Sequence, residues 1–274
     1  MDVVRDRVTC AVTDGVAEVR LARPEKLNAL DPEMFEALVD VGTRLRDRDD
    51  VGAVVLSGEG RAFCAGLDFG RFAQMAQGRP ERTGGPRPQL GAARALGQQA
   101  AHVWILVPAP VVAAVHGVAF GGGLQVALGA DIRIVHPDAR LSVMEVLWGL
   151  VPDMTGTQVL PELVGRDVAK ELALTGREVT GAEAVRLGLA TRVADDPLGA
   201  ATSLAREIAG HSRSATRGVK RLVGMAGRVP LAEGLQAEQD EIGRLMGSDE
   251  QAQVVRRRLA ARRGGAGRTG GAGA

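Results

Sequence analysis

Two glycine-containing turns are the parts of this sequence whose residue types could perform chemistry. Three consecutive glycines, 121–123, follow the apolar run 111–115 and precede an apolar helical stretch. A second turn, 58–68 (GEGRAFCAGLD), follows the buried run 52–57. A strand that ends in glycines and opens a helix exposes backbone N–H groups, which hold negative charge together with the helix dipole. Two such turns can present two N–H donors to one oxyanion.

Other roles of glycine-rich turns fit this sequence less well. No Gly-Lys-Ser/Thr follows either turn, which argues against a Walker phosphate loop, and residues 117–122 do not form Gly-x-Gly-x-x-Gly. Each turn taken alone is equally compatible with tight packing of a helix on a strand. The turns themselves therefore leave the choice between an anion site and a packing device open.

The elements around the turns alternate between strands and helices. Asp14-Gly15 between the β-rich runs 8–13 and 16–21 predicts a hairpin, and Asp31-Pro32 predicts a helix start. Further strands are expected at 132–135, 140–142 and 190–193, and further helices at 90–106, 156–163, 167–174, 182–187 and 198–209, with one from Phe69. From 214 to 263 the pattern is helical only. This order indicates an α/β core with a helical C-terminal layer.

Composition narrows the class of protein. The chain has 274 residues, a formal net charge of +1 and two cysteines, which gives no argument for nucleic acid or membrane and fits a reducing compartment. The first ten residues carry charges where a signal peptide would need an apolar run. We therefore expect a soluble cytoplasmic protein. Residues 77–89 are expected to be a mobile surface loop, and the glycine-rich residues 264–274 a disordered tail.

Four motifs in order and spacing resemble the crotonase (enoyl-CoA hydratase/isomerase) superfamily. They are RPEKLNAL (23–30), GRAFCAGLD (60–68), AVHGVAFGGG (114–123) and LSVMEVLWGLVPDMTGTQ (141–158). The resemblance runs from about residue 15 to 260. It implies a crotonase-like spiral core of ββα units over residues 1–197 and a C-terminal helical trimerisation region over 198–263. It also implies an acyl-CoA thioester substrate, no permanently bound cofactor or metal, and a homotrimer or dimer of trimers.

In that family the thioester carbonyl lies between two backbone N–H groups. The matching residues here are Leu67, which follows Ala65-Gly66, and Gly122, the middle glycine of the triplet. Polarising the carbonyl acidifies the α-proton and stabilises the enolate charge on oxygen. A side chain at Gly122 would crowd the thioester.

The acid and base groups match the family only in part. Family hydratases place one glutamate two residues after the glycine triplet, where this chain has Gln125, and a second one at the position of Glu145. Gln125 can hydrogen-bond water or a substrate oxygen but cannot carry a proton. Asp153 stands where dienoyl-CoA isomerases have an aspartate, although those enzymes also have one at the position of Gln125. We expect Glu145 to be the main acid/base; Asp153 is either a second acid/base or a helix cap.

The resemblance also implies where coenzyme A and the acyl group bind. The nucleotide side would be lined by Lys26, Leu27 and Ala29, and the pantetheine side by Ala65, Gly66, Leu67, Asp68 and Phe69, beside Gly121 and Gly122. Candidates for the acyl pocket are Phe69, Phe72, Met75, Trp104 and Trp148, with a core position favoured for Trp104. Lys26 is equally compatible with a solvated loop charge.

Other candidate sites are less convincing. Cys64 is not expected to be a nucleophile, because no residue that could act as its base lies at a recognisable spacing in the sequence. The four histidines lack the spacing of metal ligands. The arginines 256–258, 262 and 263 could contact RNA, as in one crotonase relative, but a solvated helix end is favoured. The expected function is therefore hydration or isomerisation of an enoyl-CoA, as in fatty acid metabolism. The alternatives are a dienoyl-CoA or Δ3,Δ2-enoyl-CoA isomerase using Glu145 with Asp153, and a CoA- or RNA-binding homologue with little turnover.

Overall fold

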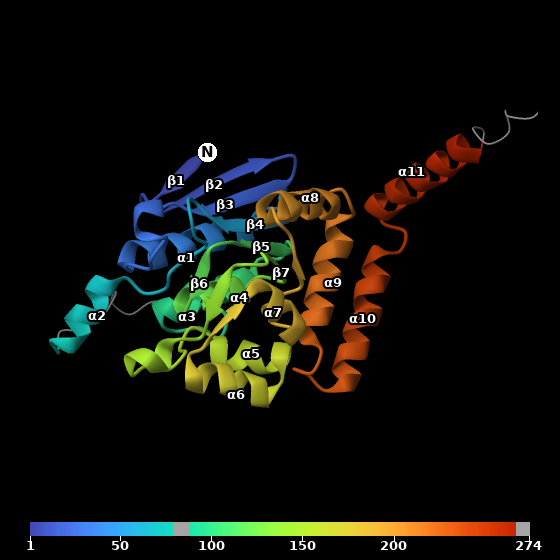
Figure 1. The fold of residues 1–274 in the computed structure, drawn as a ribbon. Helices are drawn as coiled ribbons and strands as arrows, with labels where there is room; N and C mark the ends of the chain where they lie inside the picture. Colours follow the sequence, from blue (N-terminus) through green and yellow to red (C-terminus); the bar gives the residue numbers. More distant parts are fainter. Residues whose placement is uncertain (79–87, 267–274) are drawn as a thin grey trace, which may run out of the picture.

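The computed structural model describes residues 1–78 and 88–266, with the side chains of the last helix described as far as residue 261. Most of the predicted mobile loop 77–89 and most of the predicted disordered tail lie outside these residues. The described chain forms a seven-stranded sheet in the order β1-β2-β3-β4-β5-β7-β10 and a three-stranded sheet in the order β6-β8-β9, with helices around both (Figure 1). The predicted α/β class is confirmed.

The large sheet begins with an antiparallel edge. Strands β1 (Asp2–Val4), β2 (Val8–Thr13) and β3 (Val16–Leu21) pair in sequence. Asp14 and Gly15 between β2 and β3 have φ values of 51° and 76°. Positive φ at both central residues is typical of a type I′ hairpin turn, for which Asp-Gly is a preferred pair. The hairpin predicted from these two residues is confirmed.

The rest of the large sheet is parallel and buried. Its strands are β4 (Ala53–Gly58), β5 (Val111–Val115), β7 (Ile132–Val135) and β10 (Arg192–Val193), each parallel to its neighbour. All five residues of β5 are buried, as are the first five of β4. Continuous apolar runs are typical of strands that are covered on both faces. The carboxyl ends of β4 and β5 lead into the two glycine turns.

The small sheet connects the second turn to the region of the carboxylates. It consists of β6 (Val118–Phe120), β8 (Arg140–Ser142) and β9 (Glu178–Thr180). An isolated bridge between Cys64 and Ala119 joins the first turn to β6. The two glycine turns are thereby fixed side by side.

Helices cover both faces of the large sheet. One core joins it to α1 (Pro32–Arg46), α3 (Leu96–Leu106) and α4 (Gly122–Leu128). On the other face α8 (Pro197–Ala209) packs against β4 and β5 through residues such as Ala201 and Ala205. Sequence analysis assigned most of α8 to the C-terminal region, but its packing places it with the sheet.

Short helices surround the end of the small sheet. They are the 3₁₀ helices η1 (Pro24–Lys26) and η2 (Glu145–Trp148) and the α-helices α2 (Phe69–Ala76), α5 (Gly156–Val164), α6 (Arg166–Thr175) and α7 (Gly181–Leu187). The predicted start of α3 at Leu90 is wrong by six residues. Gly91 has a φ of 56°, and the Gln98 side chain accepts hydrogen bonds from the N–H groups of Arg94 and Ala95, which fixes the helix start at Leu96.

Three helices complete the chain: α9 (Arg213–Met225), α10 (Leu231–Leu245) and α11 (Asp249–Ala266), of which α11 extends away from the body (Figure 1). The buried ammonium of Lys220 on α9 lies 2.7 Å from Asp131 and ties this helix to the end of the sheet. Exposed apolar side chains remain on α9 and α10, including Val219, Val223, Leu235 and Ile242. The homotrimer stays a prediction. None of the described helices combines the length and apolar character needed to cross a bilayer.

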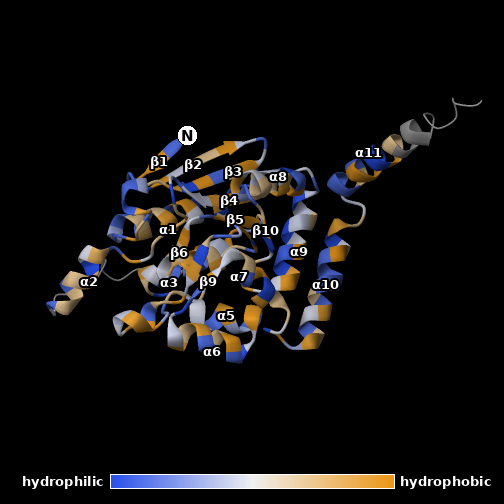
Figure 2. Ribbon diagram, in the orientation of Figure 1, coloured by the Kyte–Doolittle hydropathy of each residue, from blue (hydrophilic) through white to orange (hydrophobic). Residues whose placement is uncertain are grey.

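Hydropathy follows this architecture. Figure 2 shows apolar colour concentrated on the central strands, whereas α9, α10 and α11 alternate between polar and apolar residues. The core is therefore built by the sheets and their covering helices, and the C-terminal helices add little to it.

Candidate active site

The first glycine turn approaches the second so closely that only glycine fits. Gly66 has a φ of 87°, and a Cβ placed on it would lie 2.5 Å from the carbonyl oxygen of Phe120. L-residues rarely adopt this φ, and the contact would be with rigid backbone. The turn therefore delivers Leu67 to the vicinity of Gly122.

The second turn opens α4 with an unusual backbone. Gly121, the N-cap, has φ 49° and ψ −120°, and its N–H donates to the carbonyl of Ser142 at 2.9 Å. Within the described residues the N–H groups of Leu67 and Gly122 have no hydrogen-bond acceptor, and both residues line one cavity. Two unpaired backbone donors on adjoining turns can stabilise an oxyanion in that cavity.

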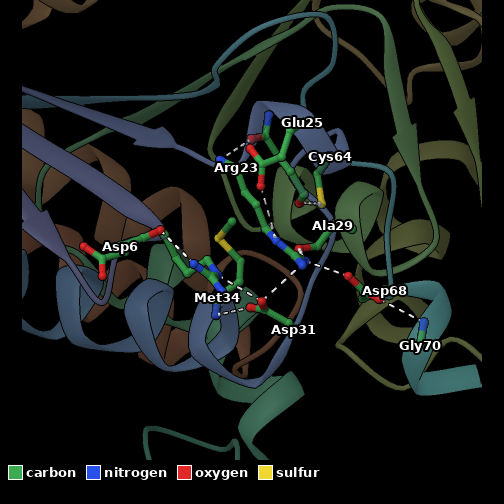
Figure 3. A network of polar contacts seen from close by, with 11 residues as sticks. Asp6, Arg23, Glu25, Ala29, Asp31, Met34, Cys64, Asp68 and Gly70 are labelled. Atoms are coloured by element: carbon green, nitrogen blue, oxygen red, sulfur yellow. Dashed lines mark hydrogen bonds and ion pairs between the residues drawn. The ribbon is translucent and has the colours of Figure 1, made fainter. Parts of the chain in front are cut away.

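An ion-pair network holds the first turn in place. The Arg23 guanidinium lies 2.6 Å from the Asp68 carboxylate and 3.3 Å from that of Asp31 (Figure 3). Asp31 also accepts from the Met34 N–H at 2.8 Å and Asp68 from the Gly70 N–H at 2.9 Å, so each caps a helix. Partial burial works to raise the pKa of Asp68, but the bonds from Gly70 and Arg23 hold it below its ordinary value.

Glu145 is the carboxylate best placed for proton transfer. It begins η2 and lines the cavity, and a Cβ on Gly121 would lie 3.3 Å from its Oε1. Oε1 accepts a hydrogen bond from the Gln125 amide at 2.5 Å, whereas the buried Oε2 has no described partner. Burial raises the pKa of Glu145; the charge of Asp153 adds to the rise and hydrogen bonds, including that from Gln125, oppose it.

Gln125 does not line the cavity, and both the oxygen and the nitrogen of its amide are hydrogen-bonded. Its Oε1 accepts from the N–H groups of Met154 and Gly156, each at 2.9 Å, and the residue is 1% exposed. Because two backbone donors require the oxygen on that side, the NH₂ group must face Glu145. Gln125 therefore holds the Glu145 carboxylate in its orientation from outside the cavity lining.

Asp153 lines the same cavity as Glu145. The residue as a whole is exposed, but partial burial of its carboxyl group raises the pKa of that group. The alternative interpretation as a helix cap is wrong, because the N-cap of α5 is Thr155, which has a φ of 74° and no side-chain cap bond. Two carboxyl groups that retain protons more readily than usual thus share one cavity.

The cavity has a volume of about 1280 Å³, above the usual range for a small-molecule site. It brings together most of the residues predicted from the sequence, namely Leu27, Ala65, Gly66, Leu67, Phe69, Gly121, Gly122, Glu145 and Asp153. The acyl-pocket candidates Phe72, Met75 and Trp148 also line it, whereas Lys26, Ala29, Asp68 and Trp104 do not. The side chain of Trp104 is fully buried in the core. Sequence analysis missed Phe35, Arg94 and Arg140, for which no motif gives a signal.

The structure also bears on two other kinds of site, a cysteine nucleophile and a metal centre. The Cys64 thiol donates to the Asn28 carbonyl at 3.0 Å, and its complete burial raises its pKa to about 12, so it is no nucleophile. No group of His, Cys, Asp and Glu side chains suited to a metal ion occurs among the residues that the structure describes.

Comparison with known proteins gives concordant results. The family model for enoyl-CoA hydratase/isomerase matches residues 11–258. A Mycobacterium leprae protein named "Probable enoyl-CoA hydratase echA8" is 36% identical over 81% of this chain and 83% of its own. The 1,2-epoxyphenylacetyl-CoA isomerase of Escherichia coli is 33% identical over 84% and 86%. The crystal structure of an enoyl-CoA hydratase from Bacillus anthracis is 28% identical, covers 91% of this chain and 95% of its own, and superposes with a TM-score of 0.81.

Proposed function

Because the chain belongs to the enoyl-CoA hydratase/isomerase family, we propose that Glu145 transfers the proton next to the thioester carbonyl while Leu67 and Gly122 hold the carbonyl oxygen. The observation that carries the proposal is the Glu145 Oε2 atom. It is buried without a hydrogen-bond partner in a residue that lines the same cavity as the two unpaired N–H groups. A buried, unpartnered carboxylate oxygen is costly unless a ligand uses it.

Each group has a defined task in this mechanism. The N–H groups of Leu67 and Gly122 donate to the thioester oxygen and stabilise the negative charge that develops there. Glu145 Oε2 removes or returns the proton at the adjacent carbon. Gln125 donates to Oε1, which leaves the unpartnered Oε2 as the more basic oxygen. Ala65 and Gly66 would line the pantetheine side of the bound coenzyme A, and Leu27 its nucleotide side.

This mechanism is compatible with hydration of an enoyl-CoA and, as a second candidate, with isomerisation. Two observations favour isomerisation over hydration. Asp153 lines the cavity with Glu145, so two carboxyl groups could remove a proton at one carbon and return it at another. The Gln125 carbonyl oxygen already accepts two backbone N–H groups, so it is poorly placed to hold an attacking water. The E. coli relative named above is itself called an isomerase.

An assay of the purified protein on crotonyl-CoA, 3-enoyl-CoA and 3,5-dienoyl-CoA separates these reactions. Loss of the crotonyl-CoA double-bond absorbance would support hydration. Its appearance from 3-enoyl-CoA, or activity on the dienoyl substrate alone, would support isomerisation. Turnover of none of the three would contradict the proposal and favour a homologue that binds CoA or RNA without catalysis.

Asp153→Asn is expected to slow isomerisation about 100-fold and to slow any hydration of crotonyl-CoA less than tenfold. The physical reason is that the amide keeps the shape of the carboxyl group but cannot carry a proton. Asp195→Asn, at an exposed position outside the cavity, is the matched control. Equal rates for the Asp153→Asn variant and the wild-type protein on 3-enoyl-CoA would remove Asp153 from the mechanism.

Gln125→Glu is expected to move the acid limb of the kcat/KM profile to higher pH by about one unit or more. As a base Glu145 must be ionised, so the rate falls as pH drops through its pKa. The variant replaces a donor by a carboxylate 2.5 Å from Oε1, and the like charge raises that pKa further. Gln158→Glu on the exposed face of α5 is the control. An acid limb that stays in place would contradict the assigned contact between Gln125 and Glu145.

A further inference from the structure

The aromatic side chains of this protein are concentrated in one place. The chain contains five phenylalanines, two tryptophans and no tyrosine. Five of these seven residues line the cavity: Phe35, Phe69, Phe72, Phe120 and Trp148. The other two, Phe63 and Trp104, are completely buried in the core. Two aromatic residues are thus fully enclosed in the core, and the other five, including Phe35 at the edge of the core, line the cavity.

Three of the five form a cluster that is open to solvent. The rings of Phe72 and Trp148 are stacked with centroids 4.3 Å apart and 20° between their planes. Phe69 lies edge-on to Trp148 at 5.7 Å and 72°. Phe69 is 73% exposed and Trp148 44%. Large apolar surfaces that remain exposed in a folded chain often mark a binding site.

The cluster lies at a defined position relative to the base. Glu145 and Trp148 are the first and last residues of η2. In a 3₁₀ helix, side chains three residues apart are eclipsed, and the rise is about 2.0 Å per residue. Trp148 therefore stands on the same side as Glu145 and roughly 6 Å further along the helix axis. An acyl group that reacts at Glu145 and extends along η2 would reach the indole after roughly 6 Å.

We propose that the acyl group of the substrate carries an aromatic ring close to the reacting carbons, and that Trp148 with Phe69 and Phe72 binds this ring. The proposal rests on the proposed function, because it assigns the acyl end of the same site. A flat ring can pack face-on or edge-on against this cluster, whereas a saturated ring or chain gains only the burial of its area. Trp148 is then a specificity-determining residue.

Binding of two saturated thioesters tests this inference independently of turnover. Isothermal titration of the full chain would compare 3-phenylpropanoyl-CoA with 3-cyclohexylpropanoyl-CoA, which differ only in the ring: it is flat and aromatic in the first and puckered and saturated in the second. Neither contains a double bond to hydrate or isomerise. We expect the phenyl ester to bind about five- to tenfold more tightly, in keeping with the strength of aromatic pairing.

Two variants test which rings cause the preference. Trp148→Leu is expected to bring the two affinities within twofold of each other. Phe69→Leu, at an exposed position where the ring contacts Trp148 and Phe72, is expected to reduce the preference part of the way. Leu147→Ala is the matched control, because Leu147 belongs to the same 3₁₀ helix and does not line the cavity. The ratio should be unchanged in this control.

The outcomes separate this inference from the proposed function. Equal or tighter binding of the cyclohexyl ester, or a phenyl preference that survives Trp148→Leu, would overturn the aromatic assignment and leave the acyl-CoA function intact. A variant that changes the particle mass in sedimentation but not the affinity ratio would also overturn it, because the cluster would then be a contact between chains. Failure of both esters to bind would contradict the proposed function itself.

Discussion

Glu145→Gln is expected to lower kcat for the enoyl-CoA substrate by about 10²–10⁴-fold, with little change in KM. Glutamine has the same shape, and its carbonyl oxygen can still accept the bond from Gln125. The variant should therefore fold and bind normally. What it loses is the proton-carrying oxygen Oε2, which is buried and unpartnered in the free protein.

The control for this variant is Glu33→Gln, on the exposed first turn of α1. Its kcat should equal that of the wild-type protein. Because burial raises the pKa of Glu145, the wild-type rate should also fall as pH drops through a value above the ordinary range of a glutamate. A Glu145→Gln enzyme with unchanged kcat would exclude Glu145 as the acid/base.

Gly122→Pro is expected to lower kcat by about 10²–10³-fold, the usual loss for one oxyanion donor. Proline is tolerated at the first position of a helix, which Gly122 occupies in α4, so the fold should survive. The substitution removes the N–H and places a ring carbon where the thioester oxygen would bind.

Gly122→Ala separates the lost donor from the added side chain. A Cβ on Gly122 would lie 2.8 Å from Met154 Sδ and 2.9 Å from Leu30 Cδ1, two flexible ends that can move. Both variants introduce this carbon, but only proline replaces the N–H hydrogen with a ring carbon. We expect the alanine enzyme to retain at least ten times the kcat of the proline enzyme, measured with circular dichroism as a check on folding. Equal rates would mean that the Gly122 N–H is not a donor.

Local residue patterns predicted much of the fold. The Asp14-Gly15 turn, the continuous apolar run of β5 and the Asp31-Pro32 helix start each act over a few residues, and each is confirmed. The helix start at Leu90 was wrong because the Gln98 side chain caps the chain further on, which periodicity does not reveal.

The sequence predicted which residues form the site, but not the hydrogen bonds and ion pairs that join them. Motif positions indicated Glu145, Asp153 and the two donors, and the structure brings these into one cavity. The role of Gln125 could not be predicted from the sequence, because its hydrogen-bond partners Met154 and Gly156 are 29 and 31 residues away along the chain. The Arg23–Asp68 pair spans 45 residues and is equally invisible to local patterns.

The most direct test of the mechanism is exchange of the α-protons of butanoyl-CoA in D₂O, followed by mass spectrometry. This saturated thioester can form the enolate but has no double bond to hydrate or move. The account predicts deuterium incorporation catalysed by the wild-type protein, reduced at least 100-fold by either Glu145→Gln or Gly122→Pro. Wild-type rates of exchange in both variants would contradict the assignment of Glu145 as the base and Gly122 as the oxyanion donor.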